Sequence, residues 1–278
     1  MATAARLLLL LFLTAAASAW EMNIRLPMER LAYGGGEAVV APLIHALRPL
    51  LGSGGQLAAR AGVACDSWRL AVEAHNVIRW KTVPASCEGY VGHYMLGGHY
   101  RRDSPSSSTR PSPTLKLAGN GKEIWVFDID ETSLSNLPYF AKHGFGTTLY
   151  DDTCFREYVV EGSGLALPET RRLYRRLLQL GVKPVFLTSR TEDERNITVT
   201  NLRRQGYSGW MKLLLKPAVH TAGELLGSVV AFKSGERQKL EDAGFTIVGN
   251  IGDQWSDILG APEGARTFKL PDPLYYIG

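Results

Sequence analysis

Two aspartates one residue apart, Asp128 and Asp130, are the residues of this sequence best placed to do chemistry. They follow the apolar run 124–127, which is typical of a buried strand in a parallel sheet. Ligands of such sheets bind beyond the carboxyl ends of the strands. Neighbouring carboxylates repel each other unless a cation or a proton lies between them, and together they can supply a nucleophile, a general acid and a metal ligand. A simpler interpretation is that these residues cap the next helix.

Later apolar runs of the chain also end in residues that could do chemistry. The run 185–187 is followed by a threonine and an arginine, and the run 245–251 is followed by two aspartates. A lysine stands between the two runs. These candidate residues are Thr188, Arg190, Lys233, Asp253 and Asp257.

The ordered set of motifs, D-x-D-x-T, a strand-end threonine, a lysine and G-D-x-x-x-D, resembles the haloacid dehalogenase superfamily of phosphohydrolases. The segments DIDETSLSNLPY and IVGNIGDQWSDI look most like the class B-like plant acid phosphatases, which are related to vegetative storage proteins. The resemblance covers residues 60–278. It implies an α/β fold with a doubly wound, Rossmann-like parallel sheet, a small cap insertion and an N-terminal accessory region.

The resemblance also implies roles for the acidic residues. Asp128 would be the nucleophile, and Asp130 would protonate the leaving alkoxide and then activate water. Mg²⁺ would bind Asp128, the main-chain carbonyl of Asp130 and Asp253, while Asp257 would hold a metal-bound water. Taken alone, Asp253 and Asp257 would equally fit the N-cap and the first turn of a helix.

For the phosphoryl group, the resemblance implies that Thr188 donates a hydrogen bond, that Arg190 also binds it, and that Lys233 neutralises its charge. Lys216, which also ends an apolar strand, is the rival for the lysine role. Aromatic residues between the first two motifs could form a cap that contacts an organic leaving group. We interpret the lone histidines His143 and His220 as structural.

The beginning of the 278-residue chain predicts export. Residues 1–19 combine a basic residue, a short apolar stretch and an A-x-A end, so we expect a signal peptide that is cleaved near Ala19. No later stretch is long and apolar enough to span a membrane. We therefore expect a secreted protein, extracellular or vacuolar. The net charge of +4 is mild, its basic residues are spread out, and nucleic acid is not an expected partner.

The chain has three cysteines, and a secreted protein oxidises those that can reach each other. Cys65 and Cys87 are close in sequence, so we expect them to pair and Cys154 to be left over. Three reduced cysteines and other pairings stay open. Asn196 lies in an N-x-S/T sequon and is a candidate glycosylation site.

The expected organisation is a signal peptide at 1–19, an accessory region at 20–115 and a phosphatase core at 116–278, with a cap insertion at about 133–167. Within the accessory region, 38–51 could be a short helix. The Ser/Pro-rich residues 101–113 predict a flexible linker, where the relatives carry an amphipathic helix.

In the core, hydrophobic runs and Gly/Pro signals predict alternating strands and helices. The expected strands are 124–128, 182–188, 211–216 and 245–251, and the expected helices are 168–180, 192–205 and 234–243.

These features favour a secreted, Mg²⁺-dependent acid phosphatase that acts on small-molecule phosphomonoesters. A homodimer stays open. The alternative is a vegetative storage protein with little or no activity, but some relatives of that kind lack the nucleophile and this chain has Asp128. A carbohydrate- or partner-binding module has no positive support in the sequence.

Overall fold

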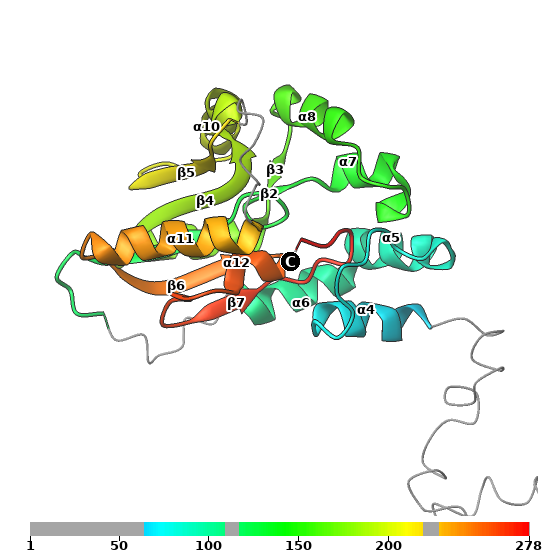
Figure 1. The fold of residues 1–278 in the computed structure, drawn as a ribbon, viewed down its shortest axis with the longest axis horizontal. Coiled ribbons are helices and arrows are strands. Elements are labelled where there is room, and N and C mark those ends of the chain that lie inside the picture. Colours follow the sequence, from blue (N-terminus) through cyan, green and yellow to red (C-terminus); the bar gives the residue numbers. More distant parts are fainter. Residues whose placement is uncertain (1–63, 109–116, 219–227, 278) are drawn as a thin grey trace, which may run out of the picture. The chain divides into compact units, whose positions relative to one another are not determined.

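The centre of the fold is a parallel sheet with the strand order β5-β4-β1-β6-β7 (Figure 1). This computed structural model describes residues 64–108, 117–218 and 228–277. The predicted signal peptide and the helix 38–51 lie outside them. In sheet order, the strands are β5 Lys212–Lys216, β4 Lys183–Thr191, β1 Glu123–Phe127, β6 Thr246–Gly252 and β7 Thr267–Lys269.

Strand β1 is buried on both faces, which explains its unbroken apolar run. Ile124 and Val126 belong to the core on the side of helix α11 (Val229–Asp242). Trp125 and Phe127 belong to the core that includes residues of helix α9 (Pro168–Gln179). Helices therefore cover both faces, and the prediction of a doubly wound α/β fold is confirmed.

The predicted core strands and helices are present. The observed first residue differs most from the predicted one in α11, where a side chain caps the helix. Helix α11 begins five residues before the predicted start, because the Ser228 hydroxyl accepts a hydrogen bond from the Ala231 amide (3.2 Å). The predicted helix 192–205 is divided into a 3₁₀ turn η4 (Glu192–Glu194) and helix α10 (Arg195–Arg204).

Between β1 and α9 lies the insertion predicted at 133–167. It contains a short antiparallel pair of strands and two helices, of which α8 carries the exposed Cys154 near its start. Its elements are β2 Leu134–Ser135, α7 Leu137–Lys142, η3 Gly144–Gly146, α8 Asp152–Glu161 and β3 Leu165–Ala166.

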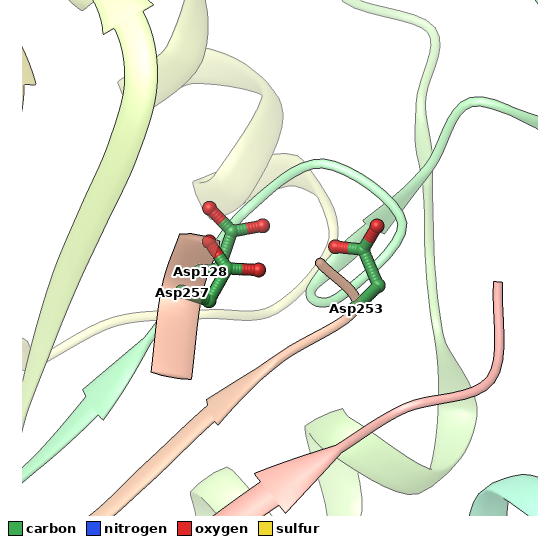
Figure 2. A group of neighbouring side chains, drawn as sticks. All are labelled: Asp128, Asp253 and Asp257. Carbon is green, nitrogen blue, oxygen red and sulfur yellow. The ribbon is translucent and has the colours of Figure 1, made fainter. Parts of the chain in front are cut away.

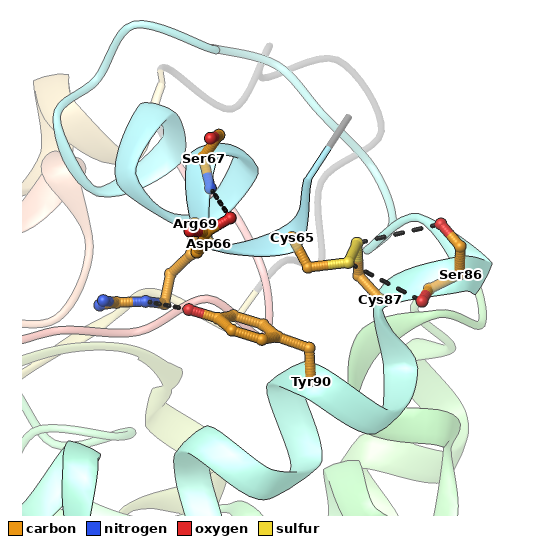
Figure 3. Close-up of a disulfide and its surroundings, with 7 residues drawn as sticks. All are labelled: Cys65, Asp66, Ser67, Arg69, Ser86, Cys87 and Tyr90. Carbon is orange, nitrogen blue, oxygen red and sulfur yellow. Dashed lines mark hydrogen bonds between the residues drawn. A yellow bond between two sulfur atoms is a disulfide. The ribbon is translucent and has the colours of Figure 1, made fainter. Parts of the chain in front are cut away.

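The described part of the accessory region is helical and shares a core with the cap insertion. Its elements are α4 Cys65–Glu73, η2 Ala85–Cys87, α5 Glu88–Leu96 and α6 Gly98–Ser108. Trp68 and Tyr94 pack in one cluster with Tyr139 and Phe140 of the cap insertion. The predicted disulfide between residues 65 and 87 is confirmed and joins α4 to η2 (Figure 3). Within the described ranges, no helix has the length and apolar character needed to cross a membrane.

The prediction that residues 101–113 form a flexible linker is wrong for 101–108, which continue helix α6. The Ser104 hydroxyl donates to the Tyr100 carbonyl (2.8 Å), and the Tyr94 hydroxyl donates to Asp103 (2.8 Å). Tyr100 itself is buried, and α6 contacts α9 and β7. The Ser/Pro-rich composition predicted a linker here, but a few packed side chains stabilise the helix despite that composition. Residues 109–116 lie outside the described part.

Candidate active site

The carboxyl ends of β1 and β6 bring three buried aspartates together. The amide of Asp128 donates to the carbonyl of Ile251 in β6 (3.0 Å), which aligns the two strand ends. Asp253 follows β6, and Asp257 lies in the short helix α12 (Trp255–Ile258). One carboxylate oxygen from each of Asp128, Asp253 and Asp257 lies within 4.8 Å of the others (Figure 2).

A glycine makes this close approach possible. A Cβ at Gly252, the last residue of β6, would collide with the Cβ and the carboxylate of Asp257. The Asp257 carboxylate also accepts a hydrogen bond from the Gln254 amide (2.9 Å), which holds it against the strand end. Position 252 therefore requires a residue without a side chain.

Lys233, from α11, lies between two of the aspartates. Its Nζ is 2.6 Å from Asp128 Oδ1 and also contacts Asp257 Oδ1. The rival Lys216 is not paired with these carboxylates; its Nζ lies 6.0 Å from the centre of the Phe232 ring, although the residue lines the same cavity. Of the two lysines, the structure brings Lys233 to the predicted nucleophile.

Positive charge is scarce in this cluster of three carboxylates. Burial, followed by the proximity of Asp257, raises the pKa of Asp128 well above its ordinary value. Burial alone would lower the pKa of Lys233, but Asp128 and Asp257 outweigh it and keep the ammonium charged. Asp253 has no ion-pair partner among the described residues. Oxygen donors and a shortage of positive charge are what a divalent cation site requires, so these residues fit a hard divalent cation.

Neutral donors hold the carboxylate of Asp253 on both oxygens. Thr132 Oγ1 donates to Oδ1 (2.8 Å), while Gln254 Nε2 (2.9 Å) and the Tyr275 hydroxyl (2.8 Å) donate to Oδ2. Burial, together with the nearby acids Asp272 and Asp257, raises the pKa of Asp253. These donors orient the carboxylate without supplying the missing positive charge.

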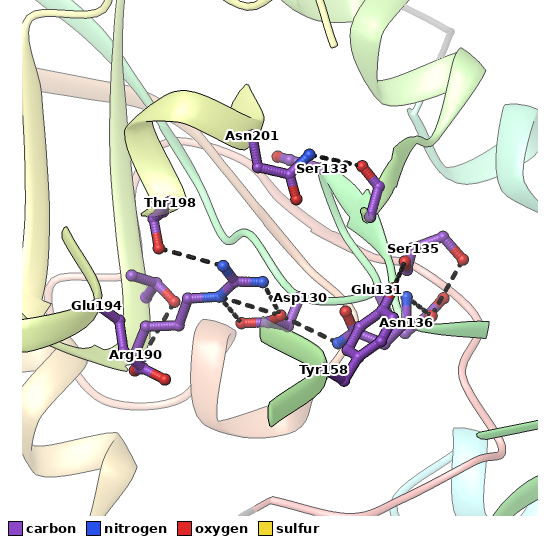
Figure 4. Close-up of polar contacts among 12 residues, drawn as sticks. Asp130, Glu131, Ser133, Ser135, Asn136, Tyr158, Arg190, Glu194, Thr198 and Asn201 are labelled. Carbon is purple, nitrogen blue, oxygen red and sulfur yellow. Dashed lines mark hydrogen bonds and ion pairs between the residues drawn. The ribbon is translucent and has the colours of Figure 1, made fainter. Parts of the chain in front are cut away.

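Asp130 is held in a different way, by an ion pair of its own (Figure 4). Arg190 Nη2 lies 2.8 Å from Asp130 Oδ1, and Arg190 Nε lies 3.0 Å from Oδ2. Asn136 Nδ2 adds a hydrogen bond of 3.0 Å to Oδ1. Burial would raise the pKa of Asp130, but Arg190 and Asn136 outweigh it and hold this pKa below its usual value.

The predicted phosphate-binding residues of β4 are both buried. Thr188 Oγ1 accepts a hydrogen bond from the Arg190 amide (3.1 Å), and Arg190 Nη1 donates to Thr198 Oγ1 (3.1 Å). The Arg190 side chain lines the cavity and forms an ion pair with Asp130, the predicted acid/base residue. The sequence did not predict this ion pair.

Glu131 makes the turn between the two motif aspartates and β2. Its φ of 49° lies in the left-handed region, which is rare for a residue with a side chain. Its carboxylate accepts hydrogen bonds from the Asn136 amide and the Ser135 hydroxyl (Figure 4). Burial, followed by the charge of Asp253, raises the pKa of Glu131 to about 8. The Glu131 side chain thus connects the end of β1 to the start of the cap insertion through hydrogen bonds.

A cavity of about 800 Å³ opens on this edge of the sheet. Asp128, Asp130 and Lys233 line its polar side. Its apolar lining includes aromatic residues of the cap insertion and one of the accessory region, namely Phe140, Tyr150, Phe155 and Trp80. His143 does not line it and instead contacts the Tyr139 carbonyl (2.7 Å), while His220 lies outside the described residues.

Several hydrogen-bond partners of the predicted site residues were not predicted from the sequence. Asn136, Gln254 and Tyr275 each bind a motif aspartate. Gln254 lies inside the G-D-x-x-x-D motif and could have been noticed. Nothing in the sequence connects Tyr275 to Asp253, because the contact depends on how the end of the chain folds back.

Comparisons with known proteins agree with this geometry. Residues 54–278 match the family model of the haloacid dehalogenase superfamily, subfamily IIIB (acid phosphatase). The chain is 40% identical over 233 residues to acid phosphatase 1 of Solanum lycopersicum, covering 83% of this chain and 90% of that protein. It is 44% identical over 217 residues to the stem 28 kDa glycoprotein of Glycine max, covering 77% and 84%.

Vegetative storage protein 1 of Arabidopsis thaliana is 40% identical over 218 residues, covering 77% of this chain and 78% of that protein. Among solved structures, the class C acid phosphatase from Bacillus anthracis aligns with a TM-score of 0.53 and 20% identity, covering 69% of this chain and 86% of that one. This last similarity supports the fold alone.

Proposed function

The chain belongs to subfamily IIIB of the haloacid dehalogenase superfamily, the acid phosphatases, and from this premise we propose that it hydrolyses phosphomonoesters through Asp128. The observation that carries the proposal is the position of this aspartate. It is buried at the end of β1, Lys233 lies 2.6 Å away, and both residues line the cavity with Asp130. A carboxylate so placed can attack phosphorus while the lysine offsets negative charge.

The proposed reaction has two steps. In the first, an Asp128 oxygen bonds to phosphorus, the ester P–O bond breaks, and Asp130 gives a proton to the leaving alkoxide. In the second, Asp130 takes a proton from water, the water oxygen bonds to phosphorus, and the bond between phosphorus and the Asp128 oxygen breaks, which releases inorganic phosphate and regenerates Asp128. Arg190 keeps Asp130 ionised, which suits the second step. The negative charge of an incoming phosphoryl group would raise the pKa of Asp130 and favour the protonated form that the first step needs.

We propose that Mg²⁺ is the metal. Its ligands would be Asp128, the main-chain carbonyl of Asp130 and Asp253, with Asp257 oriented toward a bound water. When bound, Mg²⁺ would supply the positive charge that the three carboxylates and the phosphoryl group lack. The shortage of cations around Asp253 supports this proposal. Thr188 and Lys233 would bind the phosphoryl oxygens, with Arg190 next to them, and the aromatic side of the cavity would accept an organic leaving group.

The second candidate is a storage protein with little activity, which the similarity to the Arabidopsis protein favours. One experiment separates the two. The purified protein should hydrolyse a chromogenic phosphomonoester at acidic pH, and EDTA should abolish the activity until excess Mg²⁺ is added. Absence of hydrolysis at every pH with Mg²⁺ would support the storage role. Activity that ignores the chelator would contradict the metal assignment.

We further propose that the protein is exported, to the extracellular space or the vacuole. The disulfide between Cys65 and Cys87 supports this proposal, because such bonds persist in oxidising compartments. The side chain of Asn196 is exposed in the first turn of α10, so it is accessible as the proposed glycosylation site. Peptide mass spectrometry of the protein from its native tissue tests both the leader cleavage near Ala19 and the glycan.

A further inference from the structure

The residues Asp272–Ile277, which we call the 272–277 segment, run past the candidate active site and are fixed to it. The Ile277 amide donates to Gln254 Oε1 (2.8 Å), and the Ser256 amide donates to the Ile277 carbonyl (3.2 Å). The Leu274 amide donates to Asp272 Oδ1 (2.9 Å), which shapes the turn in the segment. These contacts give the segment a defined path beside α12.

Within this segment, Tyr275 reaches a predicted metal ligand. Its hydroxyl donates to Asp253 Oδ2 (2.8 Å). Its ring stacks on Phe140 of the cap insertion, with the ring centres 5.2 Å apart and the planes 4° from parallel. The stacking leaves the phenol little freedom to turn, so its hydroxyl stays directed at the carboxylate.

Asp253 depends on such donors more than its neighbours do. Asp128 and Asp257 share the ammonium of Lys233, whereas Asp253 has no ion-pair partner in the described part of the chain and is held by the neutral donors Thr132, Gln254 and Tyr275. Hydrogen bonds to a ligating carboxylate fix its orientation, and losing one typically weakens metal binding about 10–100-fold.

We propose that Tyr275 is a positioning residue that sets the metal affinity of the site through Asp253. This inference rests on the proposed function, in which Asp253 binds Mg²⁺. Tyr275 acts on the carboxylate and not on the phosphoryl group, so its hydroxyl affects metal binding and leaves the chemical step of the loaded enzyme unchanged.

The position of Tyr275 depends in turn on the accessory region. Leu274 is buried in the same cluster as Trp68 and Val83. The Tyr276 hydroxyl lies 3.2 Å from Nε2 of His75, which follows α4. The two neighbours of Tyr275 are therefore held by the accessory region, and metal affinity at Asp253 becomes sensitive to how that region packs.

The test is the substitution Tyr275→Phe, which removes the hydroxyl and keeps the ring on Phe140. The dissociation constant of Mg²⁺ is measured by isothermal titration calorimetry on metal-free protein, beside kcat and KM at saturating Mg²⁺. We expect the dissociation constant to rise about tenfold, with kcat and KM within about twofold of wild type. The matched control is Tyr174→Phe, which removes a hydroxyl that donates to the Ser208 carbonyl (2.9 Å) away from the cavity lining and should leave the dissociation constant unchanged.

A double-mutant cycle shows whether the effect passes through Asp253. In an Asp253→Asn background, Tyr275→Phe should change Mg²⁺ affinity less than about twofold, because the carboxylate that it orients is gone. Additive losses in the double variant, or equal affinities of wild type and Tyr275→Phe, overturn the inference while the proposed function stands. A wild type that neither binds Mg²⁺ nor hydrolyses phosphomonoesters overturns the proposed function, and the inference with it. Circular dichroism and the melting temperature check that each variant is folded.

Discussion

The two sides of the candidate active site differ in how their negative charge is balanced. On one side, Asp128, Asp253 and Asp257 lie together with a single ammonium, that of Lys233, among the described residues. On the other side, Asp130 has a guanidinium of its own, with two parallel hydrogen bonds from Arg190. The first side is short of positive charge and the second is not.

This difference indicates a division of labour. A cluster that lacks positive charge can attract a cation and a phosphoryl group together. A carboxylate with its own partner keeps a defined protonation state and can exchange a proton with the substrate or water. The metal requirement should therefore depend on the first side, and the pH dependence on the second.

The largest expected effect comes from Asp128→Asn, which removes the proposed nucleophile and keeps its shape. We expect turnover to fall at least about a thousandfold, since loss of a nucleophile is not replaced by other groups. Initial rates on a chromogenic phosphomonoester measure it. The exposed Asp242→Asn, on α11, is a control for the same change of charge and should be fully active. Turnover of Asp128→Asn within about tenfold of wild type would contradict the covalent mechanism.

A smaller effect should separate the two sides directly. Asp253→Asn should raise the Mg²⁺ concentration for half-maximal activity about 10–100-fold, with activity partly restored at high Mg²⁺. Asp130→Asn should lower activity at every Mg²⁺ concentration, because it removes the proton carrier. Mg²⁺ titrations of both variants make the comparison. If high Mg²⁺ rescues Asp130→Asn as well, the two sides do not have separate roles.

The smallest effect should be a shift of the pH profile in Arg190→Lys. Lysine cannot form the two parallel hydrogen bonds, so the pKa of Asp130 should rise toward its usual value. The first step, which governs kcat/KM, needs Asp130 in its protonated form, so the basic limb of kcat/KM should move to higher pH. Arg195→Lys, which changes an exposed ion pair with Glu192, is the matched control and should leave the profile in place.

The same ion pair gives a prediction for stability. The pKa of Asp130 is depressed in the folded state. Its ion pair with Arg190 therefore adds to the free energy of unfolding above the ordinary aspartate pKa, and this gain is lost as the pH falls through the lowered pKa. Arg190→Lys should therefore lower the melting temperature at neutral pH more than at strongly acidic pH. A basic limb of kcat/KM that does not move in Arg190→Lys would show that another group titrates there.

The sequence predicted the strand ends well because burial and chemistry coincide there. The run before Asp128 is apolar since both faces of β1 are covered, and the aspartates follow since a parallel sheet exposes its carboxyl ends. The bond of Tyr275 to Asp253 and the ion pair of Arg190 with Asp130 were not predictable in this way. Each joins segments far apart in the chain, and no local pattern encodes such a contact.

For helix α6, the local sequence pattern predicted the wrong structure. A Ser/Pro-rich composition argues against a helix when it is averaged over thirteen positions. The residues that stabilise α6 are few, mainly Tyr100 with its neighbours Asp103 and Ser104, and tertiary packing outweighs intrinsic preference there.

Gly252 has a consequence for the gene as well as for the protein. Every amino acid other than glycine carries a Cβ, and a Cβ at this position would enter the volume that Asp257 occupies. Every missense mutation of codon 252 should therefore disturb the aspartate cluster, whatever the polarity of the new residue. In a saturation library selected for phosphatase activity, this codon should keep only its synonymous forms, although its side chain takes no part in the reaction.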